Sequence, residues 1–345
     1  KGKKMTWDVD YLRDNRDENM GFLSKTLLPD GTEIPGTNFD YNYLQHRKVD
    51  VVSSALDFIL PFEKYKITAG AKVSFTNTRN GINYDTSDPT LVQDDYFRYK
   101  EQIYALYADY SREYSERFSM QLGLRMEHTR TTGISEAKDT EDKHDYTRLF
   151  PTVYLLYSPT DGHALNFSFS NRISRPSQNM VNPFPFYQNK YTYACGREDL
   201  KPSYTYNAEL GYTLKNNFNV SAYYSYSDDV FFQVVDLDAE TNVTSFLWEN
   251  FMQTHAFGLN NSYTFRTKWL QTYAQHGVSY RRTTSSAATT SPEEKGWAYN
   301  ASLRNTFFFN EKKTLLATLS SSYSSRQYQG IYLMSPTYSI SAGML

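Results

Sequence analysis

Apolar and polar residues alternate with a period of two along most of the chain. In residues 118–127, every even position is apolar and every odd position is polar or glycine. Similar alternation occurs in residues 65–76, 164–172, 208–214 and 315–323. A period of two is that of a β-strand whose two faces meet different surroundings. The alternating runs reach about 10 to 15 residues, whereas strands of soluble proteins are typically about 5 to 6 residues long.

Short and long connections alternate between the predicted strands. Short polar turns recur roughly every 45 to 55 residues, near 61–64, 111–116, 159–162, 215–217, 266–268 and 310–313. Between them lie longer connections, near 14–45, 79–96, 132–145, 174–203, 232–246 and 284–295. Outer-membrane β-barrels have this rhythm, with short periplasmic turns and long extracellular loops. A soluble β-sandwich would show turn signals about every 8 to 12 residues instead.

These patterns predict an all-β fold, an antiparallel transmembrane β-barrel that forms a single domain over residues 1–345. We expect about fourteen strands, with centres near residues 8, 53, 71, 104, 124, 152, 168, 210, 224, 258, 277, 303, 320 and 338. A tilted strand needs roughly 9 to 11 residues to cross a bilayer, which these runs provide. Because unpaired backbone groups are costly in hydrocarbon, the sheet must close on itself or on partner strands.

The composition agrees with strands that lie between an apolar phase and water. The 345 residues include 31 Tyr and 22 Phe, yet the mean hydropathy is −0.65. Transmembrane barrels place aromatic residues in girdles at both membrane interfaces. A soluble all-β domain with a Tyr-rich surface, such as a carbohydrate-binding module, has a similar composition, so composition alone leaves both classes open.

Several other classes are disfavoured. No run of about 18 apolar residues predicts a transmembrane helix. With 36 Lys+Arg against 38 Asp+Glu, the chain lacks the basic surplus of a nucleic-acid binder. The six histidines have no metal-ligand spacing, and the single cysteine, Cys195, permits no internal disulfide. No nucleophile elbow, zinc-protease motif or phosphate-binding glycine loop is present. We therefore expect no catalytic residue, metal or cofactor.

One segment after the strand at 164–172 carries distinctive motifs. It contains Asn171-Arg172-Ile173-Ser174-Arg175-Pro176, then Asn182-Pro183-Phe184, then Gly196-Arg197-Glu198-Asp199-Leu200-Lys201-Pro202. This run resembles the outer-membrane β-barrel family of TonB-dependent receptors, in which a strand ends in Arg-x-x-Arg-Pro, followed by Asn-Pro-Phe and Gly-Asn-Pro-x-Leu-x-Pro-Glu. The sharp match covers roughly 35 residues. Arg197, Glu198 and Ser203 stand where the family usually has Asn, Pro and Glu.

The resemblance implies a transporter in the outer membrane of a Gram-negative bacterium. Family barrels have 22 strands, a plug in the lumen and an N-terminal region that contacts the TonB complex. About fourteen strands without a plug would therefore be the later part of a longer receptor, inserted in outer-membrane lipid. Its cargo would be a scarce nutrient: a small molecule, a glycan, a peptide or a metal chelate. Two alternatives are a passive or structural barrel, which an even strand number permits, and a soluble glycan-binding protein.

The motif residues form the first candidate site. Pro176 favours an extended backbone at Arg175, and the other prolines stiffen the long loop that follows. The loop could contact cargo, or it could be a structural clasp on the barrel rim. The motif residues are Arg172, Arg175, Pro176, Asn182, Pro183, Phe184, Gly196, Leu200 and Pro202.

A second candidate set comes from the polar positions of the alternating strands. These side chains would face the lumen, where they could line a cargo path or simply solvate the inner wall. They are Gln121, Arg125, Glu127, Asn166, Ser168, Asn207 and Glu209.

Overall fold

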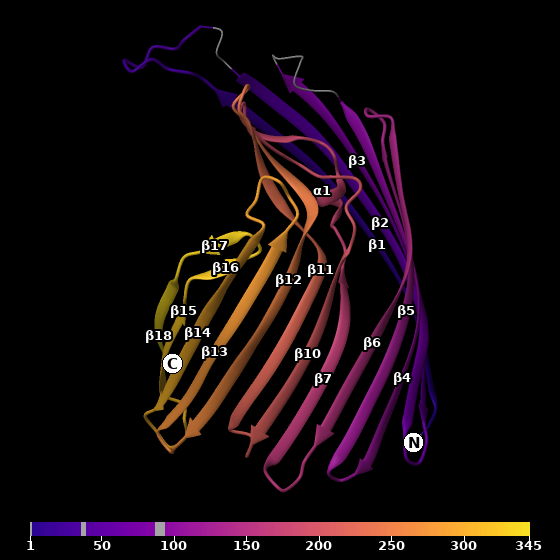
Figure 1. The fold of residues 1–345 in the computed structure, drawn as a ribbon, viewed down its shortest axis with the longest axis vertical. Helices are drawn as coiled ribbons and strands as arrows, with labels where there is room; N and C mark the ends of the chain where they lie inside the picture. Colours follow the sequence, from indigo (N-terminus) through magenta and orange to yellow (C-terminus); the bar gives the residue numbers. More distant parts are fainter. Residues whose placement is uncertain (1, 36–38, 87–93) are drawn as a thin grey trace.

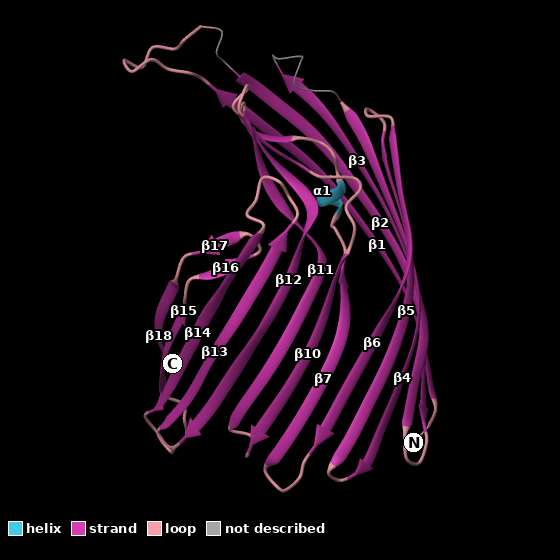
Figure 2. Ribbon diagram, in the orientation of Figure 1, coloured by secondary structure: helices cyan, strands magenta, loops and turns pink. Residues whose placement is uncertain are grey.

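The computed structural model describes residues 2–35, 39–86 and 94–345, almost all of them in strands or turns (Figures 1 and 2). Fourteen main strands form one antiparallel sheet, and each pairs with the next along the chain. They are β1 (Lys4–Ser24), β2 (Phe39–Pro61), β3 (Lys66–Thr86), β4 (Asp95–Ser115), β5 (Phe118–Ser135), β6 (Thr140–Tyr157), β7 (His163–Ser174), β10 (Ser203–Leu214), β11 (Phe218–Asp238), β12 (Val243–Arg266), β13 (Leu270–Ser285), β14 (Glu293–Phe308), β15 (Leu316–Ser324) and β18 (Thr337–Met344).

Two long connections contain further elements. Between β7 and β10 lie the short helix α1 (Gln178–Val181) and the strands β8 (Phe186–Asn189) and β9 (Thr192–Cys195). Between β15 and β18 lies a small hairpin of β16 (Gln327–Gln329) and β17 (Tyr332–Met334). Over the described ranges, no helix has the length and apolar character needed to cross a bilayer.

The predicted fold class is confirmed, and every predicted strand centre lies inside one of the fourteen main strands. The predicted loop at 174–203 is confirmed, since β7 ends at Ser174 and β10 begins at Ser203. The boundaries of the other predicted loops were wrong, because the strands that lead into and out of these loops run further than expected. Residues 36–38 and 87–93 of two of these loops lie outside the described residues.

The loop predicted at 132–145 shrinks to four residues between Ser135 and Thr140. The pairing of β5 with β6 continues through this region. Beyond the membrane both faces of a hairpin meet water, so the alternation of apolar and polar residues that marks a strand disappears. The backbone hydrogen bonds between the two strands do not depend on that alternation, and the pairing continues.

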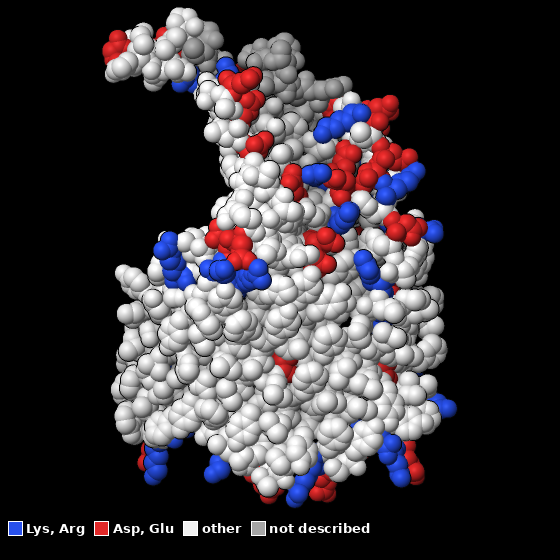
Figure 3. All heavy atoms as spheres, viewed as in Figure 1, with Lys and Arg blue, Asp and Glu red and all other residues white. Residues whose placement is uncertain are grey.

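The two faces of the sheet differ as the alternation predicts. Leu106, Leu124, Leu210 and Leu259 are 51 to 56 % exposed on the outward face. Such exposure of apolar side chains is normal where the surroundings are lipid. In Figure 3 a broad band with few charged residues separates charged residues at the two ends of the molecule. The end with the short turns corresponds to the periplasmic side and the end with the long connections to the cell exterior.

The sheet curves into an open trough with β1 at one edge and β18 at the other (Figure 1). Among the residues that the structure describes, no pairing joins these two strands. Their side chains are among the most exposed of the chain, with Trp7 at 69 % and Tyr338 at 85 %. The described sheet is therefore a curved wall with two unpaired edges.

Candidate functional site

The connection between β7 and β10 folds back against the concave side of the sheet; we call residues 175–202 the inner segment (Figure 1). Its strand β9 pairs in parallel with β12, matching Thr192–Cys195 to Thr244–Leu247. On the same strand β12, pairing with β13 begins only at Met252. The inner segment thus occupies part of a strand edge that the neighbouring strand leaves open.

An apolar cluster fixes the inner segment to the wall. Val181, Phe184 and Leu200 of the segment are at most 4 % exposed. They belong to one cluster with Tyr41 of β2 and Phe97 of β4. The rings of Phe97 and Phe184 meet edge-on, with centroids 6.2 Å apart. Burial of a large apolar side chain contributes about 1.5–3 kcal/mol, so this cluster is the main apolar attachment of the segment.

Inside the segment, two stretches of the motif cross at Gly196. The Gly196 amide donates to the Asn182 carbonyl at 2.8 Å, and the Arg197 amide donates to the Met180 carbonyl at 2.8 Å. A Cβ at position 196 would lie 2.4 Å from the Asn182 carbonyl oxygen. The side chain of Asn182 also accepts from the Phe184 amide at 3.2 Å. Glycine is therefore required here by the close approach of two backbones.

Arg175 joins the start of the inner segment to two wall strands. Its Nη2 lies 2.5 Å from Glu127 Oε2 and 3.2 Å from Thr129 Oγ1 on β5. Its Nε lies 3.9 Å from Glu101 Oε2 on β4. Arg125 Nε donates to the other oxygen of Glu127 at 2.5 Å. The structure therefore brings together Arg175 from the motif set with Arg125 and Glu127 from the lumen set.

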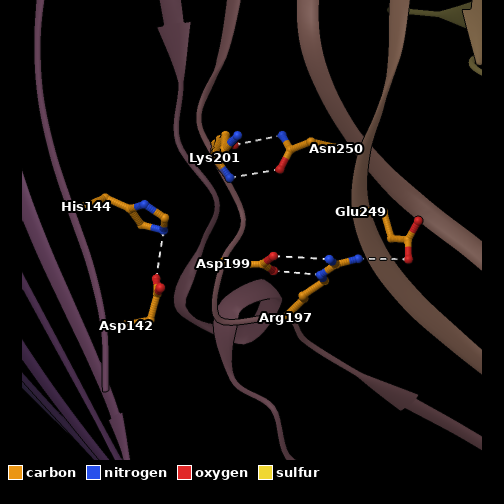
Figure 4. Close-up of polar contacts among 7 residues, drawn as sticks. All are labelled: Asp142, His144, Arg197, Asp199, Lys201, Glu249 and Asn250. Atoms are coloured by element: carbon orange, nitrogen blue, oxygen red, sulfur yellow. Dashed lines mark hydrogen bonds and ion pairs between the residues drawn. The ribbon is translucent and has the colours of Figure 1, made fainter. Parts of the chain in front are cut away.

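At the other end of the segment, Arg197 bridges two carboxylates (Figure 4). It contacts Asp199 through Nε at 2.6 Å and Nη2 at 3.1 Å, and Glu249 of β12 through Nη1 at 2.9 Å. Hydrogen bonding to Asp199 raises the pKa of Arg197 above its usual value. Arg197 departs from the family motif, so the motif did not reveal this bridge.

Asn250 of β12 is a second contact that sequence reasoning missed. Its Oδ1 accepts from the Lys201 amide at 2.8 Å, and its Nδ2 donates to the Lys201 carbonyl at 2.9 Å (Figure 4). The same Nδ2 donates to the Asp229 carbonyl at 2.7 Å. Nothing in the local sequence marks Asn250, because its partner lies 49 residues away. On the nearby strand β6, which Figure 4 also shows, His144 Nε2 lies 2.8 Å from Asp142 Oδ2.

The remaining motif residues differ in exposure. Asn182, Pro183, Gly196 and Pro202 are buried, Pro176 is half-buried and Arg172 is exposed. Arg172 lies on β7 opposite Thr205 of β10, outside the apolar cluster.

The other predicted lumen residues share one face of the sheet with Glu127. The register places Ser168 opposite both Glu209 and Tyr154, and Tyr154 opposite Gln121. The remaining two, Asn166 and Asn207, alternate onto that face within β7 and β10. Ser168, Asn166 and Gln121 line a concavity near the short turns. This part of the face lies away from the inner segment, whose Arg175 pairs with Glu127.

A cavity of about 330 Å³ lies between the inner segment and the wall. Its lining includes Arg16, Tyr43 and Arg47 from β1 and β2, Phe186 and Cys195 from the inner segment, and Trp248 from β12. The Arg47 Nε is buried without a hydrogen-bond partner, although Arg47 Nη2 lies 3.3 Å from Asp14. Burial raises the pKa of the Cys195 thiol, an effect that Lys138 partly offsets. The cavity thus offers aromatic walls, a guanidinium donor and a thiol that is largely protonated at neutral pH.

Comparison with solved structures shows the same fold at low sequence identity. The copper transporter OprC is 12 % identical with a TM-score of 0.64, over 95 % of this chain and 56 % of OprC. The ferric yersiniabactin uptake receptor FyuA from Yersinia pestis is 13 % identical with a TM-score of 0.58, over 98 % of this chain and 51 % of FyuA. The ferripyoverdine receptor of Pseudomonas aeruginosa is 14 % identical with a TM-score of 0.52, over 97 % of this chain and 47 % of the receptor.

The chain spans about half the length of these structures. A search of curated proteins found no match. The model of the outer membrane protein beta-barrel family, however, matches residues 1–345. This match and the exposed apolar band place the protein in the outer membrane and set aside the soluble glycan-binding alternative. The chain belongs to the outer membrane protein beta-barrel family.

Proposed function

We propose that this chain is the barrel portion of a TonB-dependent outer-membrane receptor that imports a scarce nutrient without catalysing a reaction. In this proposal, further strands pair with β1 and β18 to complete a 22-stranded barrel. A plug closes the lumen, and a region outside this sequence contacts the TonB complex. The fourteen-stranded passive barrel is less well supported, because the edges of the described sheet are not paired with each other.

The observation that carries the proposal is the inner segment, which is folded into the mouth and encloses a cavity with β1, β2 and β12. An apolar cluster and an ion pair hold this segment against the wall, so that the cavity has a defined shape. A receptor needs a shaped external surface of this kind, because cargo must bind before it is transported. The names of OprC and FyuA, a copper transporter and a ferric yersiniabactin receptor, agree with uptake as the general role.

We assign separate roles to the inner segment and to the wall residues around it. The buried motif residues Asn182, Phe184, Gly196 and Leu200 hold the segment in place, as a clasp would. Cargo contact is assigned instead to the side chains that line the cavity, namely Arg47, Phe186, Cys195 and Trp248. The polar residues near the short turns, among them Gln121, Asn166 and Ser168, are assigned to the inner wall beside the plug.

Uptake measurements on a deletion strain test the proposal. The strain is supplied in turn with ferric siderophores, copper, glycans, peptides and vitamins, each at limiting concentration. We expect the uptake of one class to require the gene, and to fail equally in a strain that lacks TonB. The proposal is wrong if no class requires the gene. The passive barrel is supported if uptake requires the gene but not TonB.

A double variant that changes the cavity locates the binding surface. Complementation with Trp248→Ala combined with Arg47→Gln should reduce uptake at limiting cargo and leave the amount of receptor unchanged. The matched control is Trp297→Ala, since Trp297 is 61 % exposed on the outward face of β14. Equal uptake by the two strains would contradict the assignment of the cavity, while the receptor function would stand on the deletion result.

A further inference from the structure

Three cations lie side by side across neighbouring strands on the outward face of the sheet. The register places Lys48 of β2 directly opposite Arg79 of β3, and Arg79 directly opposite Arg98 of β4. Like charges in directly opposed positions of an antiparallel pair destabilise the pairing. A fourth cation, Lys100, lies one position further along the same face, opposite Asn77. We call Lys48, Arg79, Arg98 and Lys100 the basic patch.

The strands on either side add no carboxylate to this row. Lys48 is opposite Asn15 of β1, and Arg98 is opposite Ile134 of β5. In the part of the chain that the structure describes, Lys48 and Lys100 make no hydrogen bond or ion pair. Among the same described residues, Arg98 Nε comes within 3.4 Å of the side-chain amide of Asn77, an amide that Arg79 also approaches, at 3.2 Å. Because β2, β3 and β4 are paired on both sides, completion of the barrel at its edges leaves the row unchanged.

The nearest carboxylate already has several partners. Asp50 accepts from Arg13 Nε at 2.6 Å and from the Tyr11 hydroxyl at 3.1 Å, while its other oxygen accepts from Arg79 Nη2 at 3.2 Å. Two further carboxylates on this face have other partners, since Asp17 of β1 contacts His46 at 2.8 Å and Glu141 of β6 contacts Lys143 at 2.8 Å. Arg13 and the four cations of the basic patch are therefore served mainly by Asp50. The surface therefore carries a surplus of positive charge with unused hydrogen-bond donors.

The basic patch lies at the boundary of the lipid-facing band. On the same face, toward the short turns, lie Val52, Phe75 and Tyr104, which are 38 to 44 % exposed. The rings of Phe75 and Tyr104 meet edge-on, with centroids 5.8 Å apart. The patch lies on the side of the long connections, which is the outer side of the membrane. A ligand here would place an anionic group on the patch and apolar chains against the band below it.

We propose that the basic patch binds the phosphate groups of a phosphorylated glycolipid in the outer leaflet of the membrane. Ammonium and guanidinium groups suit phosphate, and guanidinium can bind it through two hydrogen bonds. Phosphate between the three opposed cations would also remove their mutual repulsion. A free inorganic anion lacks the apolar part that fits beside Phe75, so the lipid is the better match. This inference depends on the membrane location and is independent of the cargo.

Binding of glycolipid to the full-length receptor tests the proposal. The receptor is purified, delipidated and titrated with a phosphorylated glycolipid or with its dephosphorylated form, and bound lipid is counted by native mass spectrometry. The test variant is Lys48→Gln, Arg98→Gln and Lys100→Gln, which leaves the Arg79–Asp50 contact intact. The control is Arg130→Gln with Lys143→Gln, because these outward cations already pair with Asp145 and Glu141 at 2.8 Å.

We expect the phosphorylated lipid to bind the test variant on the order of tenfold or more weakly than wild type. The control should bind it nearly normally, and the dephosphorylated form should not distinguish the three proteins. Heat-modifiable gel mobility verifies that each variant is folded. Equal binding by the test variant and wild type would overturn the proposal. It would also be overturned if inorganic phosphate alone displaced the lipid at similar concentration.

Discussion

Arg175 Nη2 lies 2.5 Å from Glu127 Oε2 and thereby ties the inner segment to the wall strand β5. The two residues are 48 positions apart and come from different sequence patterns, one from a loop motif and one from an alternating strand. Their side chains are only 22 % and 10 % exposed. Loss of Arg175 would take one of two cations from the shielded Glu127 carboxylate and leave it the contact with Arg125, so the pair is costly to break from the Arg175 side.

Removal of the Arg175 charge should loosen the inner segment. We expect Arg175→Gln to destabilise the folded receptor by about 1.5–3 kcal/mol, the usual contribution of a hydrogen bond to a charged group, because Arg125 still neutralises Glu127. Hydrogen exchange should show faster exchange over residues 175–202 than in wild type. The matched control is Arg130→Gln, whose pair with Asp145 is more than half exposed and contributes at most about 1 kcal/mol. Similar exchange in the two variants would show that the Arg175 pair does not hold the segment.

A methyl group at position 196 should disturb the backbone crossing. Gly196→Ala places a Cβ 2.4 Å from the Asn182 carbonyl oxygen, so we expect a cost of about 1–3 kcal/mol from forced backbone shifts. Gly81→Ala is the control, since its nearest contact would be 3.6 Å away on a side chain. Urea unfolding of the lipid-reconstituted protein measures both. A Gly196→Ala variant as stable as Gly81→Ala would contradict the tight crossing.

The Asn250 side chain should hold the end of the inner segment near Lys201 through both its oxygen and its nitrogen. Asn250→Ala loses the hydrogen bonds to the Lys201 amide, the Lys201 carbonyl and the Asp229 carbonyl. Each buried polar group left unsatisfied costs about 1–3 kcal/mol, although partial exposure at this site will reduce the total. Asn250→Asp keeps the acceptor for the Lys201 amide and removes only the donors. Proteolysis near residues 199–203 should be faster for both variants than for wild type; unchanged cleavage in both would rule out this role.

Cys195 should react slowly with maleimide. Burial raises the pKa of its thiol, so less thiolate is present at neutral pH than for a free cysteine, and the rate should climb as pH rises toward the raised pKa. Lys138 lowers that pKa, so Lys138→Gln should slow the reaction further at fixed pH. Trp248→Ala should speed the reaction of Cys195, because Trp248 and Cys195 line the same cavity and the smaller side chain opens it. A reaction as fast as that of an unstructured peptide thiol would contradict the described burial.

The sequence by itself determined where the strands lie and which face of each is apolar. Leu122, Leu124 and Met126 alternate with polar neighbours, and this local pattern follows from the geometry of a single strand. It located fourteen strands and the alternation of short and long connections. It did not locate the outer ends of the strands, since hairpins that extend into water lose the alternation but keep their backbone pairing.

Only the tertiary structure decided which distant residues meet. The parallel pairing of β9 with β12, the Arg175–Glu127 pair and the Asn250 contacts each join segments far apart in the sequence. Such contacts depend on how a loop folds back over the sheet, and this folding leaves no periodic trace. The opposed row of Lys48, Arg79 and Arg98 likewise appears only in the register between strands. If the register of β3 shifted by one residue against β2 and β4, the Arg79 side chain would lie on the other face of the sheet.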